Sequence, residues 1–411
     1  MDLNFGKKYK DFTKEVKDFC KKYKGIHFID SSKVPLSGSF KSGEIKMTRS
    51  DWQKILIEKG YFARSIPSEY GGYGGESDII KSRIIAEEFA KSKIPPPMGG
   101  QGIDMLVPTL LELGTEEQKQ KYIKPTLHGE IIWCQGYSEP NAGSDLASLQ
   151  TKGELIDGNW VINGQKIWTS TAQYSQMMFC LVRTEPDASK HAGISYLLIP
   201  MDSEGIEVRP LVDMTMKAGF NEVFFTDVKI PDSQRLGEIG DGWKVSLTTL
   251  KNERLAVGDA SGVDFQEIFE LAKDQDFNGD TAISNGAVRE KLADWYCEQS
   301  GLKYTKMRNI SALSQGSTPG PEASITKIVS ANKLQDIANY GMDLMDNASI
   351  ARDEETAIFQ GSLLGAPLIR IAGGTDEVLK NIIAEQVLGM PQDIRVDKNV
   401  PFNEIPTGSK N

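Results

Sequence analysis

The sequence has few of the residues that build metal centres or disulfide frameworks. Among its 411 residues are three histidines and four cysteines. The cysteines show no Cys-x-x-Cys spacing, and the histidines form no His-Glu-x-x-His or paired pattern. Zinc sites and disulfide scaffolds depend on such spacings. We therefore expect no metal site, and we interpret the cysteines as small buried side chains in a reducing compartment.

Targeting and membrane segments are also lacking. The first 25 residues are rich in Lys and Asp and carry no apolar stretch of the secretory type. The first arginine is Arg49, which disfavours an Arg-rich transit peptide. No apolar run approaches the roughly 20 residues that a membrane helix needs. The sequence therefore predicts a cytoplasmic protein without membrane insertion.

Positive charge is in deficit. The chain has 57 acidic and 47 basic residues, a formal net charge of −10. An acidic chain without a strong basic block is poorly suited to nucleic acid or to an anionic membrane. We expect neither as a partner. Hydrophobic residues make up 39% of the chain and aromatic residues 8%, which is enough to form buried cores.

The hydrophobic pattern divides the chain into three blocks. Residues 1–131 are predicted to be helical, because apolar residues recur on one helix face and capping-box pairs mark helix starts. The apolar face is formed by Phe12, Val16, Phe19, Cys20 and Tyr23, and the capping pairs are Ser50 with Gln53 and Thr115 with Gln118.

The middle block, residues 132–240, has a period of two. Asp157-Gly158 is a hairpin signal, and aromatic or β-branched segments follow it. Segments 177–182, 195–199 and 223–228 are further predicted strands. Strands gathered in one block between helical blocks indicate an α+β fold with a β domain inserted between two α-helical domains, rather than alternating βαβ units.

The third block, residues 241–411, returns to the helical period. Residues 243–271 contain no proline and are predicted as one long helix. Residues 274–287 are polar and predicted as a loop, with helices expected over 289–307 and 322–345. A last helix is expected from the N-cap Thr375 to Gly389, with Pro391 beyond. We expect an irregular tail after it.

Signatures of metal hydrolases, P-loop enzymes and Gly-x-Ser-x-Gly hydrolases are missing from the sequence. What stands out is Tyr137-Ser-Glu-Pro-Asn-Ala-Gly-Ser-Asp145, a loop rich in hydroxyl groups and small side chains. Such a loop lets a flat ligand or a phosphate approach the backbone closely. Taken alone, the composition of the segment favours an ordinary surface loop between strands.

Four separated segments together resemble the acyl-CoA dehydrogenase family. They are Ser138-Glu-Pro-Asn-Ala-Gly-Ser-Asp145, Asn163-Gly-Gln-Lys-Ile-Trp-Thr-Ser170, Phe224-Phe-Thr-Asp-Val-Lys-Ile-Pro231 and Gly373-Gly-Thr-Asp-Glu-Val-Leu-Lys-Asn-Ile-Ile-Ala384. Their order, and the helix–strand–helix block order, agree with the family over nearly the whole chain. The resemblance implies an N-terminal helical domain, a central antiparallel β-barrel-like domain and a C-terminal four-helix bundle.

The resemblance also implies FAD, bound without a covalent link between the β domain and the C-terminal helices. The residues that match the family's flavin contacts are Gln135, Tyr137, Ser138, Gly143, Ser144, Trp168, Thr169, Ser170, Thr375 and Glu377. Ser138 and Ser170 stand where the family usually has threonine, so a hydroxyl group is kept at both positions. For Trp168, the alternative is a core aromatic side chain on a strand.

The family's reaction is α,β-dehydrogenation of an acyl-CoA thioester to the trans-2-enoyl-CoA, with a carboxylate as base. Many members carry this glutamate where the present sequence has Gly373. A second arrangement places it on the first long helix of the C-terminal domain, which here corresponds to Glu253. Ser246, Thr249 and Leu250 share its helix face and are uncharged. The alternative is a solvated helix glutamate.

By the same resemblance, Ser144, Arg254 and Gly374 are expected to bind the acyl-CoA substrate. Two departures bear on this transfer. The family's Arg-x-x-Phe-Gly segment, which contacts the FAD of a neighbouring subunit, is replaced by the polar stretch 274–285. Glu385 stands where some members carry arginine on the last helix.

Three functions are consistent with this reading. The first is an FAD-dependent acyl-CoA dehydrogenase that passes electrons to an electron-transfer flavoprotein, as a homodimer or homotetramer. The second is a partner subunit of a heteromeric dehydrogenase, in which a sister chain completes the site. The third is an acyl-CoA oxidase, which would form peroxide rapidly in air. The resemblance does not name the acyl chain.

Overall fold

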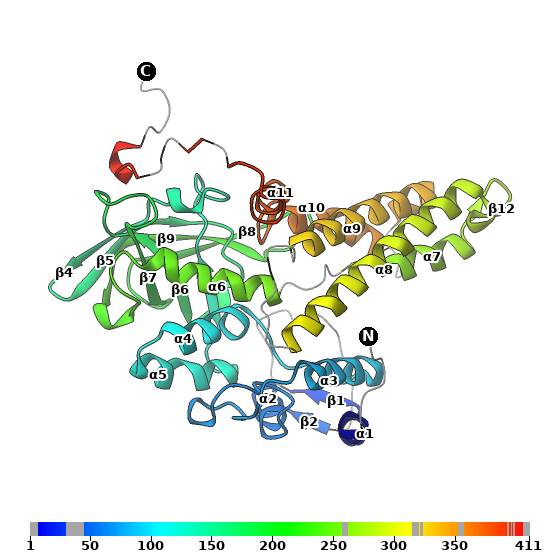
Figure 1. Cartoon of the computed structure of the whole chain (residues 1–411), viewed down its shortest axis with the longest axis horizontal. Coiled ribbons are helices and arrows are strands. Elements are labelled where there is room, and N and C mark those ends of the chain that lie inside the picture. Colours follow the sequence, from blue (N-terminus) through cyan, green and yellow to red (C-terminus); the bar gives the residue numbers. More distant parts are fainter. Residues whose placement is uncertain are drawn as a thin grey trace. The chain divides into compact units, whose positions relative to one another are not determined.

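The computed structural model describes residues 7–29, 45–256, 262–314, 320, 324–351, 357–392, 394–395, 397 and 399–405. Contacts group them into two compact units. The first unit comprises Met1–Leu211, Ala218–Glu253 and Val396–Asn411, and the second comprises Val212–Lys217 and Arg254–Arg395. Figure 1 shows the elements of both units. Within the described residues, no helix has the length and apolar character needed to cross a membrane.

The first unit begins with helices that bury one apolar face each. Their bounds, with those of a short parallel strand pair, are α1 Lys7–Lys22, β1 Ile26–Phe28, β2 Ile45–Met47, α2 Arg49–Glu58, α3 Ile79–Ser92, α4 Val107–Leu113 and α5 Glu116–Leu127. The predicted face of α1 is confirmed, since Phe12, Val16 and Phe19 are buried against α2 and α3 in one core.

One predicted helix start is confirmed and one is wrong. Thr115 and Gln118 form the expected capping box at α5. Ser50 does not cap α2, because Thr48 accepts the Asp51 amide instead and the helix begins at Arg49. Gln53 is buried and donates to the Leu127 carbonyl at 3.1 Å.

The predicted β block forms one sheet. Its strands are β3 Trp133–Gly136, β4 Lys152–Ile156, β5 Asn159–Lys166, β6 Met177–Arg183, β7 Ile194–Pro200, β8 Ile206–Leu211, β9 Phe220–Pro231 and β10 Arg235–Leu236. The order is β10-β7-β6-β4-β5-β9-β8, with β3 added beside β6. Pairing is antiparallel except for β3 with β6 and one parallel residue pair between β4 and β6.

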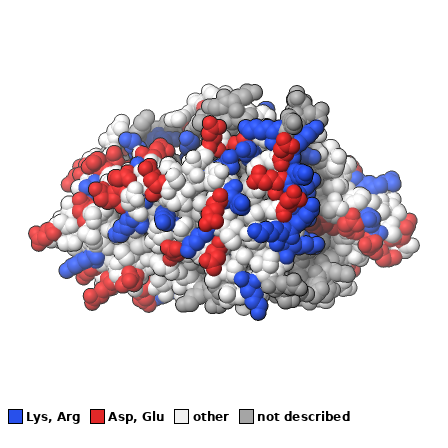
Figure 2. Space-filling view, turned by 90° about the horizontal axis from the view of Figure 1, so that it is seen from below, with Lys and Arg blue, Asp and Glu red and all other residues white. Residues whose placement is uncertain are grey.

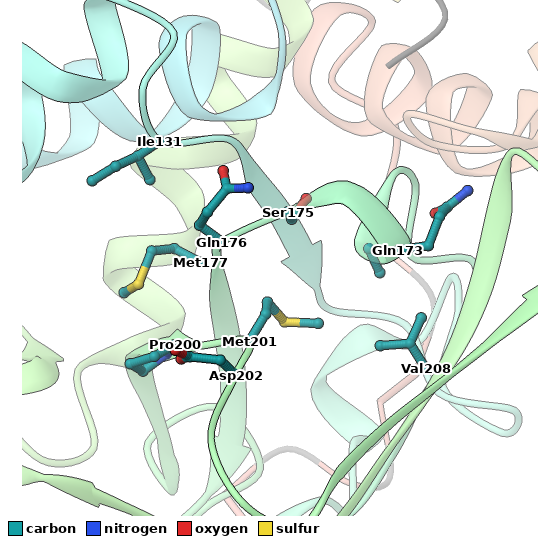
Figure 3. A pocket seen from close by; sticks show the side chains of 10 residues that line it. Ile131, Gln173, Ser175, Gln176, Met177, Pro200, Met201, Asp202 and Val208 are labelled. Atoms are coloured by element: carbon teal, nitrogen blue, oxygen red, sulfur yellow. The ribbon is translucent and has the colours of Figure 1, made fainter. Parts of the chain in front are cut away.

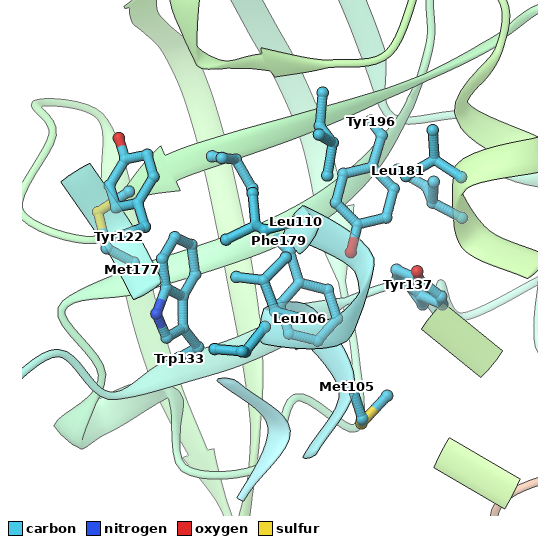
Figure 4. Close-up of a cluster of buried hydrophobic side chains, with 14 of the residues drawn as sticks. Met105, Leu106, Leu110, Tyr122, Trp133, Tyr137, Met177, Phe179, Leu181 and Tyr196 are labelled. Carbon is cyan, nitrogen blue, oxygen red and sulfur yellow. The ribbon is translucent and has the colours of Figure 1, made fainter. Parts of the chain in front are cut away.

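Strand β6 is buried on both faces, which explains its continuous apolar run. Met177, Phe179 and Leu181 pack into a core that includes Leu106 and Leu110 of the helical segment (Figure 4). The alternate residues of β6 face a second core, which the other strands fill with side chains such as Trp160 and Val228. The sheet thus curves around this second core, as the barrel-like prediction requires, while its end strands β10 and β8 are not paired with each other within the described residues.

Helix α6, Gly242–Ala256, belongs to the first unit as far as Glu253. Its Thr249 hydroxyl lies 3.1 Å from that of Thr109 in α4 and 3.2 Å from that of Tyr196 in β7. The prediction of one helix over 243–271 is wrong, because Val263 and Asp264 are not helical. Asp264 forms a capping box with Glu267 and opens a new helix, α7.

The second unit is a helical bundle. Its elements are α7 Phe265–Asp274, β11 Asp276–Phe277, β12 Asp280–Thr281, α8 Gly286–Ser314, α9 Ser324–Met345, α10 Ala357–Ile371 and α11 Asp376–Ile382. Helices α7 to α10 share one core that includes Ile268, Trp295, Ile337 and Phe359. The expected four-helix bundle is therefore present, and α10 is a helix that the pattern did not predict.

The surface carries both signs of charge. Acidic and basic side chains alternate over the face drawn in Figure 2. Short ion pairs such as Arg83 with Glu87, at 2.7 Å, add to this mixed pattern. A surface of this kind keeps a protein dispersed in water without defining a partner.

Candidate active site

The first signature segment, 138–145, follows strand β3, which packs closely against β6. A side chain at Gly136 would place its Cβ 2.4 Å from Met178 Sδ and 3.0 Å from Cys180 Sγ, so only glycine allows β3 to approach β6 this closely. The Tyr137 ring is buried edge-on against Phe179 and Tyr196. Tyr137–Gln150, here called the first loop, therefore starts from a rigid point in the core.

Glu139 folds the first loop back on itself. Its backbone exchanges two hydrogen bonds of 3.0 Å with Ala142 and closes a four-residue turn. Its carboxylate accepts the amides of Gln150 at 2.7 Å and Thr151 at 2.9 Å. One side chain thus ties the beginning of the loop to its end.

A buried lysine completes this anchor. Lys166, on β5, donates from Nζ to Glu139 Oε1 at 2.7 Å and to the Tyr137 carbonyl at 3.1 Å. Burial acts to raise the pKa of Glu139, but the Lys166 charge and the hydrogen bonds to the carboxylate lower it overall. The sequence motifs alone assigned no role to either residue. The period of two places Lys166 on the same side of β5 as buried Trp160 and Ile162, which was a usable signal.

The second signature segment, Ile167–Thr171, is here called the second loop. Trp168 and Thr171 adopt positive φ angles of 59° and 60°, which turn the chain sharply after β5. Ile167 donates its amide to the Ser138 carbonyl at 2.9 Å, which brings the two loops together. Asn221 of β9 holds the second loop from its other side by donating to the Thr169 carbonyl at 2.8 Å.

The two loops present groups that suit a flat, polar-edged ligand. The Trp168 side chain is 59% exposed and contacts Phe220 edge-on, so the structure does not place it in a core. Thr169 is fully buried, and its hydroxyl has no hydrogen-bond partner within the described residues. Gly143 and Ser144 are exposed. An exposed indole beside an unsatisfied hydroxyl and open backbone is an arrangement that a ligand can complete.

The remaining predicted flavin contacts of the first unit lie nearby. Gln135 is half-buried and accepts a hydrogen bond of 3.5 Å from Gln101 Nε2. Ser138 and Ser170 are half-buried, and the Ser170 carbonyl accepts from the Thr171 hydroxyl at 2.7 Å. These positions come from β3 and from the ends of the two loops, which the hydrogen bond between Ile167 and Ser138 joins.

The predicted residues of the second unit gather at the start of α11. Thr375 caps this helix by accepting the Val378 amide at 3.2 Å, as predicted. The backbone of Glu377 and the Thr375 hydroxyl lower the pKa of the exposed Glu377 carboxyl. Gly373 and Gly374 have φ angles of 66° and 95°, and Lys327 Nζ donates to the Gly374 carbonyl at 2.6 Å.

The side chains of Glu253 and Arg254 lie outside the described residues, although their backbone belongs to helix α6. The helix face of position 253 can be followed through the two preceding turns. Ser246 and Thr249 are fully buried there, and Leu250 is half-buried. Lys251, on the opposite side, is exposed. The face is therefore turned into the protein along the described part of the helix.

The two departures from the family pattern have structural counterparts. The predicted loop 274–287 contains the β11–β12 hairpin, and α8 begins within it at Gly286. This hairpin lies at one end of the bundle (Figure 1). Glu385 is paired with Arg395 at 3.7 Å within the same unit. Where some family members carry arginine, this chain therefore has a carboxylate, and Arg395 is the cation paired with it.

A separate pocket lies at the start of β6, at the end of the strand where β3 also begins. Its volume is about 680 Å³, and Figure 3 shows its lining. The lining residues are Ile131, Ala172, Gln173, Ser175, Gln176, Met177, Pro200, Met201, Asp202 and Val208. None of the predicted site residues is among them.

Comparison with known families accounts for most of the chain. Residues 26–130, 134–228 and 240–388 match the acyl-CoA dehydrogenase N-terminal, middle and C-terminal domains. The chain belongs to the acyl-CoA dehydrogenase family. It is thus a member of a class of flavoprotein oxidoreductases, and the family that the four sequence segments predicted is confirmed.

Individual relatives agree. Acyl-CoA dehydrogenase IpdE1 of Mycolicibacterium smegmatis is 34% identical over 375 residues, covering 88% of this chain and 93% of that protein. FadE34 of Mycobacterium tuberculosis is 37% identical over 83% of this chain, but the matched part is only 46% of FadE34. Among solved structures, the Tcur3481–Tcur3483 steroid ACAD has a TM-score of 0.74 at 25% identity, covering 96% of this chain and all of that one.

Proposed function

We propose that this chain catalyses FAD-dependent α,β-dehydrogenation of an acyl-CoA thioester, with Glu253 as the base. The observation that carries the proposal is the meeting of the two loops, through the Ile167 amide and the Ser138 carbonyl at 2.9 Å. A buried Thr169 hydroxyl that lacks a partner among the described residues lies in the second loop. The division into domains 1–131, 132–240 and 241–411 is part of the same proposal.

The residues of the two loops fit a flavin. Ser138, Thr169 and Ser170 offer hydroxyl groups and the neighbouring backbone offers amides, both of which suit the polar edge of an isoalloxazine ring. Trp168, with most of its indole exposed, suits the ring face. We propose that Gln135, Tyr137, Gly143, Ser144, Thr375 and Glu377 complete the binding site. FAD, when bound, supplies the acceptor for the β-hydride.

The protein's part in the reaction is to remove the α-proton and to stabilise the negative charge that develops on the thioester. Glu253 takes the pro-R α-proton of the thioester, whose carbonyl makes this proton more acidic. Hydrogen bonds to the thioester oxygen, to which we assign Gly374, stabilise the negative charge that develops there. Ser144 and Arg254 hold the substrate. Gly373 has no side chain to act as base, and its φ angle of 66° is one that a glutamate rarely adopts.

The test is reduction of the bound flavin. Glu253→Gln is expected to bind FAD but to be bleached by acyl-CoA about 10²- to 10⁴-fold more slowly, which is the usual contribution of a positioned base. Lys251→Gln is the matched control, because it alters the solvent side of the same helix. Reduction of the Glu253→Gln protein at the wild-type rate would remove the assignment of the base.

We propose a bulky acyl group as the substrate. Gly373 replaces a glutamate side chain and leaves room beside the proposed thioester site. The solved relative described as a steroid ACAD supports the same class. A bleaching screen with straight, branched and ring-bearing acyl-CoAs decides this point, and faster reduction by short straight chains would contradict it.

A second candidate is a partner subunit of a heteromeric dehydrogenase. The family's Arg-x-x-Phe-Gly segment is replaced by a stretch that contains the β11–β12 hairpin. The solved relative is described by two protein names, Tcur3481 and Tcur3483. The chain expressed alone would then be colourless and gain FAD only with a sister chain. For the first candidate, the purified chain is yellow and reduces an electron-transfer flavoprotein.

A further inference from the structure

Asp397 and residues 399–405, the described residues here called segment 397–405, contact the sheet of the first unit. Phe402 donates its amide to the Ala188 carbonyl at 2.9 Å, and Asn403 donates its amide to the Pro186 carbonyl at 3.1 Å. The Asn403 side chain adds a bond of 2.6 Å to Asp187. Pro401 forms a bridge with Ser189. Residues 401–403 of the tail that the sequence predicts to be irregular are therefore docked on the turn between β6 and β7.

Arg183 connects this docked segment to the first loop. Its guanidinium is buried and lies 3.7 Å from the centre of the Phe402 ring. It donates to the Ala147 carbonyl at 2.6 Å and to the Lys190 carbonyl at 2.7 Å. Burial lowers the pKa of Arg183 to about 10. At neutral pH it remains a cation, and it contacts the first loop, the turn between β6 and β7, and segment 397–405.

Lys190 makes a second connection. Its buried Nζ lies 2.7 Å from Asp145 in the first loop and 2.8 Å from Asp397 in the docked segment. Burial acts to lower the pKa of Lys190, but the two carboxylates raise it overall. Lys190 in turn lowers the pKa of Asp397. A buried ammonium between two acids is favourable only while both stay in place.

We infer that segment 397–405 is a positioning element that holds the first loop in its binding conformation through Lys190 and Arg183. Asp145 and Ala147 are the two loop residues that it reaches through these side chains. The Glu139–Lys166 pair fixes the beginning of the loop, and this contact fixes its second half. The consequence for flavin affinity rests on the proposed function, whereas the consequence for loop order does not.

Hydrogen exchange in the ligand-free, full-length chain tests the inference. The amides of Ser148 and Leu149 bond back to Asp145 and Leu146, so they report on loop order. Asp397→Asn and Phe402→Ala are each expected to speed exchange in residues 143–150 by about fivefold or more. Exchange in β5 and β6 stays at the wild-type rate. Glu404→Gln, an exposed acid on the same segment, is the matched control.

FAD binding gives the second readout. The dissociation constant is expected to rise about fivefold or more in Asp397→Asn and to stay unchanged in Glu404→Gln. Wild-type exchange in the Asp397→Asn loop would overturn the inference, and this isosteric variant decides the matter if Phe402→Ala does not fold. A wild-type chain that fails to bind FAD counts against the proposed function. It does not affect the hydrogen-exchange test, which is made on the ligand-free chain.

Discussion

Lys166 Nζ lies 2.7 Å from Glu139 Oε1, and both side chains are buried in the first unit. The pair joins the end of β5 to the start of the first loop, so it connects both signature segments. Burying an ion pair costs desolvation free energy, which is offset only when the two charges are paired closely and their other hydrogen bonds are made. Here the lysine also reaches the Tyr137 carbonyl, and the carboxylate accepts two backbone amides.

Removal of the lysine should destabilise the protein strongly. Lys166→Met leaves the Glu139 carboxylate buried without its cation, and breaking one side of such a pair costs about 3–5 kcal/mol. Urea unfolding measures this loss as a lower midpoint. Glu207→Gln serves as a control, since its pair with Arg209 has the same distance of 2.7 Å but is exposed. Equal effects of the two variants would show that burial is not the cause.

The pair also predicts a pH dependence. Lys166 and the hydrogen bonds hold the pKa of Glu139 below its value in the unfolded chain, which is about 4.3. The stabilisation by the ionised Glu139 is therefore complete above that value and is lost as the pH falls through the folded pKa. Unfolding of wild type and Glu139→Gln, measured from pH 7 to pH 3, should give a difference that is constant above pH 5 and shrinks below about pH 4. A difference that does not change with pH would contradict this.

Local patterns were sufficient for much of the fold. The continuous apolar run 177–182 predicted β6, and the Thr115–Gln118 pair predicted the start of α5, because both signals depend on near neighbours. The helix expected over 243–271 was wrong because the hydrophobic period continues across the break, although the Asp264–Glu267 capping box that opens α7 was visible in the sequence.

Long-range contacts were beyond the same reasoning. Lys190 and Asp397 are separated by 207 residues, and Asp187 and Asn403 by 216. Nothing in the spacing of such pairs shows that they meet, since the docking depends on the shape of the folded sheet. The same holds for Lys166 and Glu139. The burial of Lys166 follows from the period of β5, but its pairing with Glu139 follows only from the folded sheet and loop.

The Thr169 hydroxyl should matter for a ligand and not for the fold. It is buried and has no hydrogen-bond partner within the part of the chain that the structure describes. Thr169→Val keeps the shape and removes an unsatisfied polar atom, so the ligand-free protein should be as stable as wild type or more so. If the hydroxyl bonds FAD, the dissociation constant should rise about tenfold, which corresponds to about 1.4 kcal/mol. Flavin fluorescence titration and thermal unfolding separate the two effects. Unchanged FAD affinity would remove Thr169 from the proposed site.

A side chain at Gly136 is expected to destabilise the protein, because strand β3 packs too closely against β6 to accommodate a Cβ atom. A Cβ at this position would lie 2.4 Å from Met178 Sδ and 3.0 Å from Cys180 Sγ, so Gly136→Ala must push β3 away from β6. Overpacking of this kind costs about 1–3 kcal/mol. Because β3 leads into the first loop, FAD affinity should fall together with the unfolding midpoint. Gly361→Ala is the control, since a Cβ there meets open space in helix α10, and it should stabilise by up to about 1 kcal/mol. A Gly136→Ala protein with wild-type stability would mean that Met178 moves aside at little cost.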